Sequence, residues 1–277
     1  MTKFEQFAKE KQYLLGVSPR TIEWYQQSLR WLNTESPSDE DLKDTVLRMR
    51  IAGLKPSSCN SRIRAINSYL HWNSNVEGNC SPSCPHPRIP RLKEPHLVLP
   101  TFSSQDIQRF ASWRPKTFTQ RRLQCLLLML ADTGARIGEV LSLRWSDVDW
   151  DSMLLTLHGK GAKDRRVPFS QALRKFLWRF RHEHQTVFCT RPGGTLGRRD
   201  VLRDTKRLCR DLGVKVPGRT LHSFRHSFAI NYLRKGGSTF HLQKVLGHSS
   251  LEMTRRYANL MTEDLSKIHQ QVTLLSA

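Results

Sequence analysis

The sequence contains no run of apolar residues long enough to cross a membrane, and its N-terminus has no apolar signal-peptide core. Its longest apolar stretch is Cys125–Ala131, far short of the roughly 20 residues that a membrane-spanning helix needs. Acidic residues are also scarce, because 24 of them stand against 45 lysines and arginines, which gives a formal net charge of +21. These shortages favour a cytoplasmic protein with a polyanionic partner, which is nucleic acid more often than an anionic membrane surface.

Cysteine is sparse too, with six residues scattered over 277 positions, so no disulfide framework is expected in a cytosolic chain. Cys80, Cys84 and His86 lie close together, but a zinc site needs a fourth ligand at a matching spacing, which the sequence does not offer. We interpret this segment as a loop with free thiols. The chain also lacks a GxxxxGK[ST] loop and lacks paired acidic residues beside its motifs, so neither ATP nor a metal ion is expected as a cofactor.

Helical periodicity dominates the first part of the chain. Apolar residues at helical spacing predict short helices across residues 1–85, with starts marked at Ser18 and Ser38. On the last of these helices, Arg62 and Arg64 lie on the side opposite the apolar stripe. The pattern fits either a compact DNA-binding unit or an ordinary helical bundle with solvated arginines. The apolar stripe of the last helix consists of Cys59, Ile63, Ile66 and Leu70.

A proline-rich segment separates this region from a second domain. Six prolines and no helical pattern occur within Asn79–Pro100, and prolines stiffen such segments. We place the linker at residues 86–100 and the second domain at residues 101–277.

The second domain combines helices with one β-hairpin. Ser103 is expected to cap a helix, and a long apolar helix is expected to end at Gly134. Met153–His158 and Arg165–Phe169 flank the segment GKGAKD and predict the hairpin. The predicted fold is therefore mainly α with a small antiparallel β-sheet.

Side chains suited to phosphodiester chemistry occur in four motifs of this domain. Arg136 and Arg225 could hold the two non-bridging oxygens of a phosphate through bidentate hydrogen bonds, which stabilises a transition state without a metal ion. Lys160 could donate a proton to the leaving sugar oxygen.

A nucleophile and its helpers are present as well. Tyr257 could attack phosphorus if its proton is removed, since a free tyrosine has a pKa near 10. His222, three residues before Arg225 on one helix face, or His248, nine residues before Tyr257, could assist near neutral pH.

The order of these motifs resembles the tyrosine recombinases, the phage integrase family, whose signature is Arg, Lys, His-x-x-Arg, His or Trp, and Tyr. The contexts TGARIGEVLSLRW, GKGAKDRRVP and LGHSS match as well. The resemblance is strong over Thr101–Asn259, and the N-terminal helices resemble the family's core-binding domain more weakly. The catalytic set that it implies is Arg136, Lys160, His222, Arg225, His248 and Tyr257.

The resemblance implies a site-specific recombinase, an enzyme of mobile genetic elements that cleaves and rejoins DNA strands through a 3′-phosphotyrosine without metal or ATP. It implies a double-stranded DNA partner, a homotetramer on DNA built from subunits that are monomers when free, and two domains with no additional N-terminal one. A topoisomerase IB-like relaxase shares this chemistry and is one alternative. A catalytically silent DNA-binding accessory protein is the other.

Several neighbouring residues receive lesser roles. Lys163 rivals Lys160 because both lie at the hairpin tip. Glu139 is expected to orient Arg136 or a histidine, and His226 is expected to pack against its own helix. The residues predicted to contact DNA are Arg62, Arg64, Lys163 and Arg165.

The last part of the chain carries one apolar stripe at helical spacing. Such a stripe must be buried against another surface, which is either the protein's own catalytic domain or a groove on a neighbouring subunit, as the family resemblance implies for an exchange helix. The stripe consists of Met261, Leu265, Ile268, Val272 and Leu275.

Overall fold

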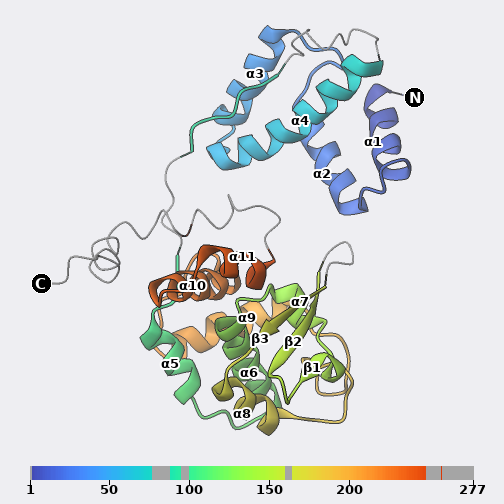
Figure 1. Ribbon diagram of the computed structural model, residues 1–277. Helices are drawn as coiled ribbons and strands as arrows, with labels where there is room; N and C mark the ends of the chain where they lie inside the picture. Colours follow the sequence, from blue (N-terminus) through green and yellow to red (C-terminus); the bar gives the residue numbers. More distant parts are fainter. Residues whose placement is uncertain (1, 77–87, 95–99, 160–163, 248–256, 258–277) are drawn as a thin grey trace, which may run out of the picture. The chain divides into compact units, whose positions relative to one another are not determined.

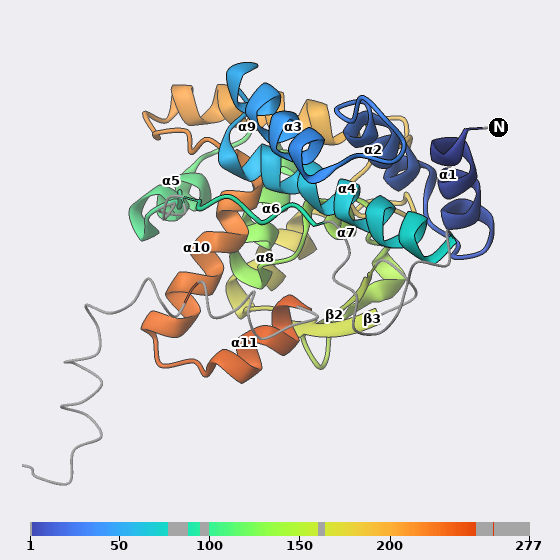
Figure 2. The same cartoon turned by 90° about the horizontal axis from the view of Figure 1, so that it is seen from above.

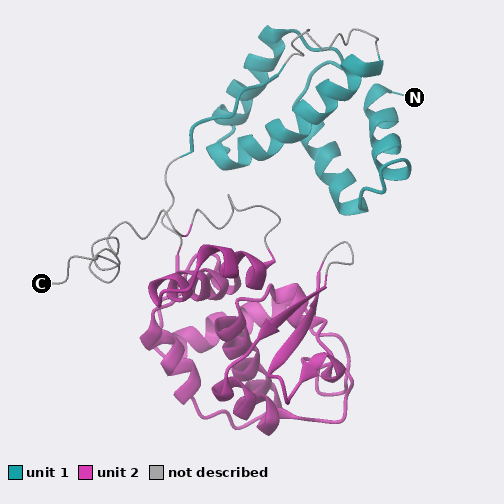
Figure 3. Cartoon of the chain, viewed as in Figure 1, with its two compact units in different colours: residues 1–97 teal, residues 98–277 magenta. Residues whose placement is uncertain are grey.

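The computed structural model divides the chain into two compact units, residues 1–97 and 98–277 (Figure 3). Each unit has its own hydrophobic core. The second unit begins three residues before the start that the sequence predicted. The residues that the structure describes are 2–76, 88–94, 100–159, 164–247 and 257.

Unit 1 is a bundle of helices around α4. Ser38 begins α3 with a capping box, as its spacing from Asp41 predicted. Ser18 is the N-cap of α2, but its hydroxyl pairs with the hydroxyl of Thr21 rather than with a backbone N–H. The predicted apolar stripe of α4 is buried, with at most 3% of each side chain exposed. The helices are α1 (Lys3–Tyr13), α2 (Pro19–Leu29), α3 (Asp39–Ile51) and α4 (Pro56–Val76).

Part of the segment predicted as a linker packs on unit 1. The side-chain amide of Asn67 donates to the carbonyl of Ile89 and accepts from its N–H, both at 3.0 Å. Two helical turns away, Asn60 makes the same pair with Leu92 at 2.9 and 2.8 Å. Ile89 is buried in the core of unit 1. Backbone pairing with two asparagine side chains leaves no periodic sequence pattern, which is why residues 88–94 read as linker.

Unit 2 is built around α6, which packs against α5, α8, α9 and α10 (Figure 1). This helix ends at Gly134, which is left-handed, as the sequence predicted. It starts at the N-cap Thr117, a start that the sequence analysis did not predict. The helices of unit 2 are α5 (Ser104–Ser112), α6 (Phe118–Thr133), α7 (Ile137–Leu141), the 3-10 turn η1 (Trp145–Asp147), α8 (Gln171–Phe180), α9 (Arg198–Asp211), α10 (Thr220–Arg234) and α11 (Thr239–Leu246).

A three-stranded antiparallel sheet lies beside these helices, in the order β1-β2-β3 (Figure 1). Its strands are β1 (Val148–Asp149), β2 (Leu154–His158) and β3 (Asp164–Pro168). Figure 2 shows β3 next to α11. Leu155 pairs with Val167 across the predicted hairpin, and both side chains are buried. The expected fold, mainly α with a small antiparallel sheet, is confirmed.

No helix in the described part of the chain is long and apolar enough to cross a membrane. The same residues contain no cluster of histidine, cysteine and carboxylate side chains placed to hold a metal ion. Cys80, Cys84 and His86, which the sequence analysis weighed as zinc ligands, lie outside the described residues.

Candidate active site

Four of the six predicted catalytic residues belong to the described structure of unit 2. Arg136 lies between α6 and α7, His222 and Arg225 lie one turn apart on α10, and Tyr257 is a buried residue packed near α10 and α11. Lys160 and His248 lie outside the described residues, as does Lys163.

Gly134 makes the turn that brings Arg136 to the start of α7. Its φ of 62° is left-handed, and a Cβ atom added there would lie 2.5 Å from Cδ1 of Phe228 on α10. Only glycine meets both conditions without strain. The close approach of α6 and α10 at this point also lets the carbonyl of Gly134 reach Arg225.

Arg225 is buried, with 5% of its surface exposed, and two helix ends hold it. Nη1 donates to the carbonyl of Gly134 and Nη2 to that of Leu246, each at 2.8 Å. Carbonyls at helix C-termini lack intrahelical partners and carry partial negative charge, so they suit a cation. Burial, and next the charge of Arg136, lower the pKa of Arg225 to about 10, which leaves it charged at neutral pH.

The last turn of α11 gathers three arginines from different elements. The carbonyl of Val245 accepts from Nε of Arg165 at 2.9 Å, and that of Gly247 accepts from Nη2 of Arg136 at 3.3 Å. The intervening carbonyl of Leu246 binds Arg225, as described above. Consecutive carbonyls of one helix end therefore fix the spacing of arginines that come from β3, α10 and the start of α7.

Glu139 links two of these arginines, Arg136 and Arg165, through its carboxylate. Its buried carboxylate accepts from both Nη atoms of Arg165 at 2.8 Å, from Nη1 of Arg136 at 2.9 Å and from the Arg136 backbone N–H at 2.7 Å. Burial raises the pKa of this carboxyl, but the hydrogen bonds from Arg165 and Arg136 outweigh burial and lower it to about 2. The expectation that Glu139 orients Arg136 is confirmed.

The residues predicted to contact DNA have different surroundings. Arg165 exposes only 13% of its side chain, and Glu139 and Val245 take up its guanidinium, a placement that favours support of Arg136 over a direct DNA contact. Arg62 is half-buried and donates to Ser28 Oγ at 3.2 Å, whereas Arg64 is exposed on α4.

His226 contacts Tyr257, which the sequence did not predict. Its Nδ1 lies 2.9 Å from Oη of Tyr257, which is 5% exposed. Burial and the charges of His222 and Arg225 lower the pKa of His226 to about 4, so that the ring is neutral at pH 7. A sequence signal existed, because His226 follows His222 by four residues and so lies on the same helix face.

His222 occupies the exposed edge of this group. Partial burial and the nearby charges of Arg198 and Arg225 lower its pKa as well. A histidine that is neutral next to arginines can donate or accept one proton at a bound phosphate. The arrangement as a whole offers two arginines, two neutral histidines and a tyrosine hydroxyl to a phosphodiester.

Comparison with known proteins points to the family that the motifs indicated. The model of the phage integrase family matches residues 101–264, more than half of the chain. Tyrosine recombinase XerA of Thermococcus kodakarensis is 30% identical over 277 aligned residues, which cover 95% of this chain and 92% of that protein. Tyrosine recombinase XerC of Xanthomonas campestris pv. campestris is 29% identical, in an alignment that covers 97% of this chain and 87% of that protein.

Solved structures share the fold. A Tn1549 transposon integrase in complex with transposon right end DNA has a TM-score of 0.77 at 18% identity, covering 96% of this chain and 100% of that one. The XerH site-specific recombinase bound to palindromic difH substrate has a TM-score of 0.74 at 18% identity, covering 96% and 83%. The chain therefore belongs to the phage integrase family and is a tyrosine recombinase, an enzyme that breaks and rejoins DNA strands.

Proposed function

We propose that Tyr257 is the nucleophile of this recombinase and that Arg136, Arg225 and His222 bind the phosphate it attacks. The observation that carries the proposal is the proximity of these groups. Arg136 and Arg225 bind adjacent carbonyls at the end of α11, and Tyr257 hydrogen-bonds to His226, the residue after Arg225. Double-stranded DNA is the partner. We propose that the enzyme acts in the cytoplasm and recombines the DNA of a mobile genetic element.

In the proposed reaction, Oη of Tyr257 bonds to phosphorus while the bond from phosphorus to the 5′ oxygen breaks. The phosphotyrosine remains on the 3′ side, and Lys160 gives a proton to the departing 5′ oxygen. Arg136 and Arg225 stabilise the charge that grows on the two non-bridging oxygens, with His222 and His248 as further donors. A 5′-hydroxyl from another strand reverses these steps, so that the energy of the broken bond is kept.

The fixed orientation of the arginines supports this assignment. Arg225 uses two of its five N–H donors on helix-end carbonyls, and Arg136 is held by Glu139 and Gly247. Side chains held before the substrate arrives need no reorganisation during the reaction, which makes their charge more effective.

The test uses nicked suicide duplexes that tile the DNA flanking the gene, because a nick next to the cleavage point lets the cut end escape and traps the adduct. Wild-type protein should form a denaturation-resistant adduct on one of them, and Tyr257→Phe should form none while binding that duplex normally. The matched control is Tyr232→Phe, a tyrosine in the last turn of α10, which should react like the wild type. An adduct in Tyr257→Phe would overturn the assignment.

The same substrates separate the alternatives. A relaxase would rejoin only the strand that it cut, whereas a recombinase joins the cut strand to a second duplex that carries a free 5′-hydroxyl. A silent accessory protein would bind without any adduct. Transfer to the second duplex is the expected result.

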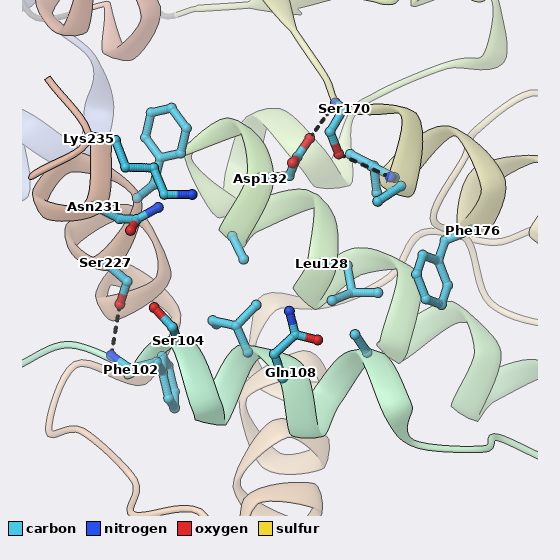
Figure 4. A pocket seen from close by; sticks show the side chains of 16 residues that line it. Phe102, Ser104, Gln108, Leu128, Asp132, Ser170, Phe176, Ser227, Asn231 and Lys235 are labelled. Carbon is cyan, nitrogen blue, oxygen red and sulfur yellow. Dashed lines mark hydrogen bonds between the residues drawn. The ribbon is translucent and has the colours of Figure 1, made fainter. Parts of the chain in front are cut away.

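We further propose that the recombinase acts as a homotetramer whose C-terminal stripe docks on a neighbouring subunit. The stripe, which begins at Met261, lies outside the described residues. A cavity of about 490 Å³ between α5, α6, α8 and α10 suits it (Figure 4). Leu128 and Phe176 line the apolar part, and Asp132 and Lys235 supply charges for a helix.

A helix docked in this cavity would contact a residue that packs against the active site. Phe228 lines the cavity and is also the side chain against which Gly134 packs. Deletion of the residues after Thr262, or Phe176→Asp in the cavity, should abolish multimers on DNA in multi-angle light scattering and leave single-site binding intact. Unchanged multimers and normal strand transfer in both variants would contradict trans docking.

A further inference from the structure

The phenol of Tyr257 already has a proton acceptor within reach. Its Oη lies 2.9 Å from Nδ1 of His226, and the two rings are 5.7 Å apart between centroids. His226 comes directly after Arg225 on α10. Two consecutive residues of a single helix therefore present the arginine that we assign to the phosphate and an imidazole that contacts Oη of Tyr257.

The protonation state of the imidazole suits an acceptor. A neutral histidine carries one proton on one ring nitrogen and a lone pair on the other. Burial, together with the charges of His222, Arg225 and Arg219, holds the pKa of His226 to about 4, so the ring is neutral over the physiological range. With its proton on Nε2, Nδ1 accepts the hydroxyl proton of Tyr257.

We propose that His226 is the general base of the cleavage step and takes the phenolic proton of Tyr257 as the tyrosine attacks phosphorus. The inference rests on the proposed function, because it assumes that Tyr257 is the nucleophile. As the bond from Oη to phosphorus forms, the Oη–H bond breaks and the proton moves to Nδ1, giving an imidazolium. The 5′ oxygen leaves with a proton from Lys160, and in rejoining His226 returns its proton to Tyr257.

The charges around His226 tie its basicity to the presence of DNA. Arg225, which disfavours the imidazolium, is a residue that would bind the scissile phosphate. A bound phosphate offsets part of this positive charge, so the base becomes stronger once the substrate is in place. Without DNA the proton stays on Tyr257, and the nucleophile is inactive.

The test compares His226→Asn with wild type in single-turnover cleavage of the active suicide duplex. The amide oxygen of asparagine can occupy the place of Nδ1 and accept the hydrogen bond, but it does not take up a proton at neutral pH. We expect cleavage to slow by about 10²–10³-fold, within the range of general-base catalysis, with DNA binding unchanged. The rate of the variant should rise tenfold per pH unit from pH 7 to 9, because hydroxide must now remove the proton. The matched control is His241→Asn, an exposed histidine at the start of α11.

A substrate with a sulfur leaving group distinguishes the general base, His226, from the general acid, Lys160. In a duplex with a 5′-bridging phosphorothiolate the departing sulfur needs no proton, so Lys160→Ala should regain its rate and His226→Asn should not. A wild-type rate and pH profile in His226→Asn would overturn the role of His226 and leave the assignment of Tyr257 intact. An adduct in Tyr257→Phe would instead overturn the proposed function itself.

Discussion

The guanidinium of Arg165 meets the carboxylate of Glu139 in two parallel hydrogen bonds of 2.8 Å each. The same carboxylate holds the backbone and the side chain of Arg136. Arg165 thus acts from β3 on a residue at the start of α7. The carboxylate that orients Arg136 is therefore itself held by an arginine whose side chain is only 13% exposed.

Glu139→Gln should destabilise unit 2 by about 3 kcal/mol, because it removes the counter-charge of a buried arginine and leaves part of the cluster unpaired. Urea denaturation of wild type and variant at pH 7 measures the difference. A loss below about 1 kcal/mol would show that solvent can replace the carboxylate, contrary to its 7% exposure.

That difference should shrink as the pH falls. The folded-state pKa of Glu139, about 2, is lower than its ordinary value of 4.5, so its contribution is complete above pH 5 and is lost as the pH falls toward 2. The denaturation series is repeated at pH 7, 5 and 3. The difference in unfolding free energy between wild type and Glu139→Gln should be almost the same at pH 5 as at pH 7, and clearly smaller at pH 3. A difference that grows at pH 3 would contradict the sign of this shift.

Arg165→Lys should slow adduct formation by about 10–100-fold, with a similar affinity for DNA, since a lysine cannot reproduce the bidentate contact that positions Glu139. Arg166→Lys is the matched control on the same strand, because Arg166 is 62% exposed and pairs only with Asp149 among the described residues. If Arg165→Lys instead weakens DNA binding and cleaves bound DNA at the normal rate, Arg165 contacts DNA, as the sequence had suggested.

Gly134→Ala and Gly213→Ala form a second matched pair, because both glycines have a φ of 62° but only Gly134 has atoms in the way of a Cβ. Gly213→Ala should lower the free energy of unfolding by about 1 kcal/mol, because alanine disfavours the left-handed backbone conformation. Alanine at Gly134 should cost at least about 2 kcal/mol more and slow cleavage, since Phe228 must move and the carbonyl under Arg225 moves with it. Equal losses in thermal denaturation would show that the close packing of α6 and α10 is unimportant.

The sequence predicts well what depends on neighbours along the chain. The capping residues Ser38 and Ser103, the left-handed Gly134 and the pairing of β2 with β3 are all where local patterns placed them. The spacing of His222 and Arg225 on one helix face is also a local property. Each of these features is set by backbone preferences or by periodicity, which a single sequence displays.

The features that the sequence missed depend on contacts between distant segments. Arg165 reaches Glu139 across 26 residues, and His226 reaches Tyr257 across 31. Asn60 and Leu92 pair across 32 residues. Charge alone suggested a DNA contact for Arg165, because only the folded chain shows the buried carboxylate that takes up its guanidinium.

The central claim is that Tyr257 is the nucleophile, and the most direct test identifies the residue that is covalently bound to DNA. Wild-type protein is trapped on the active suicide duplex and digested with trypsin and nuclease, and mass spectrometry then locates the residual nucleotide on the peptides. The account predicts that the modified peptide is the one that follows Arg256 and that the nucleotide is attached to Tyr257 through a 3′ phosphate. A nucleotide on Tyr232 or any other residue, or a 5′ linkage on Tyr257, would contradict it.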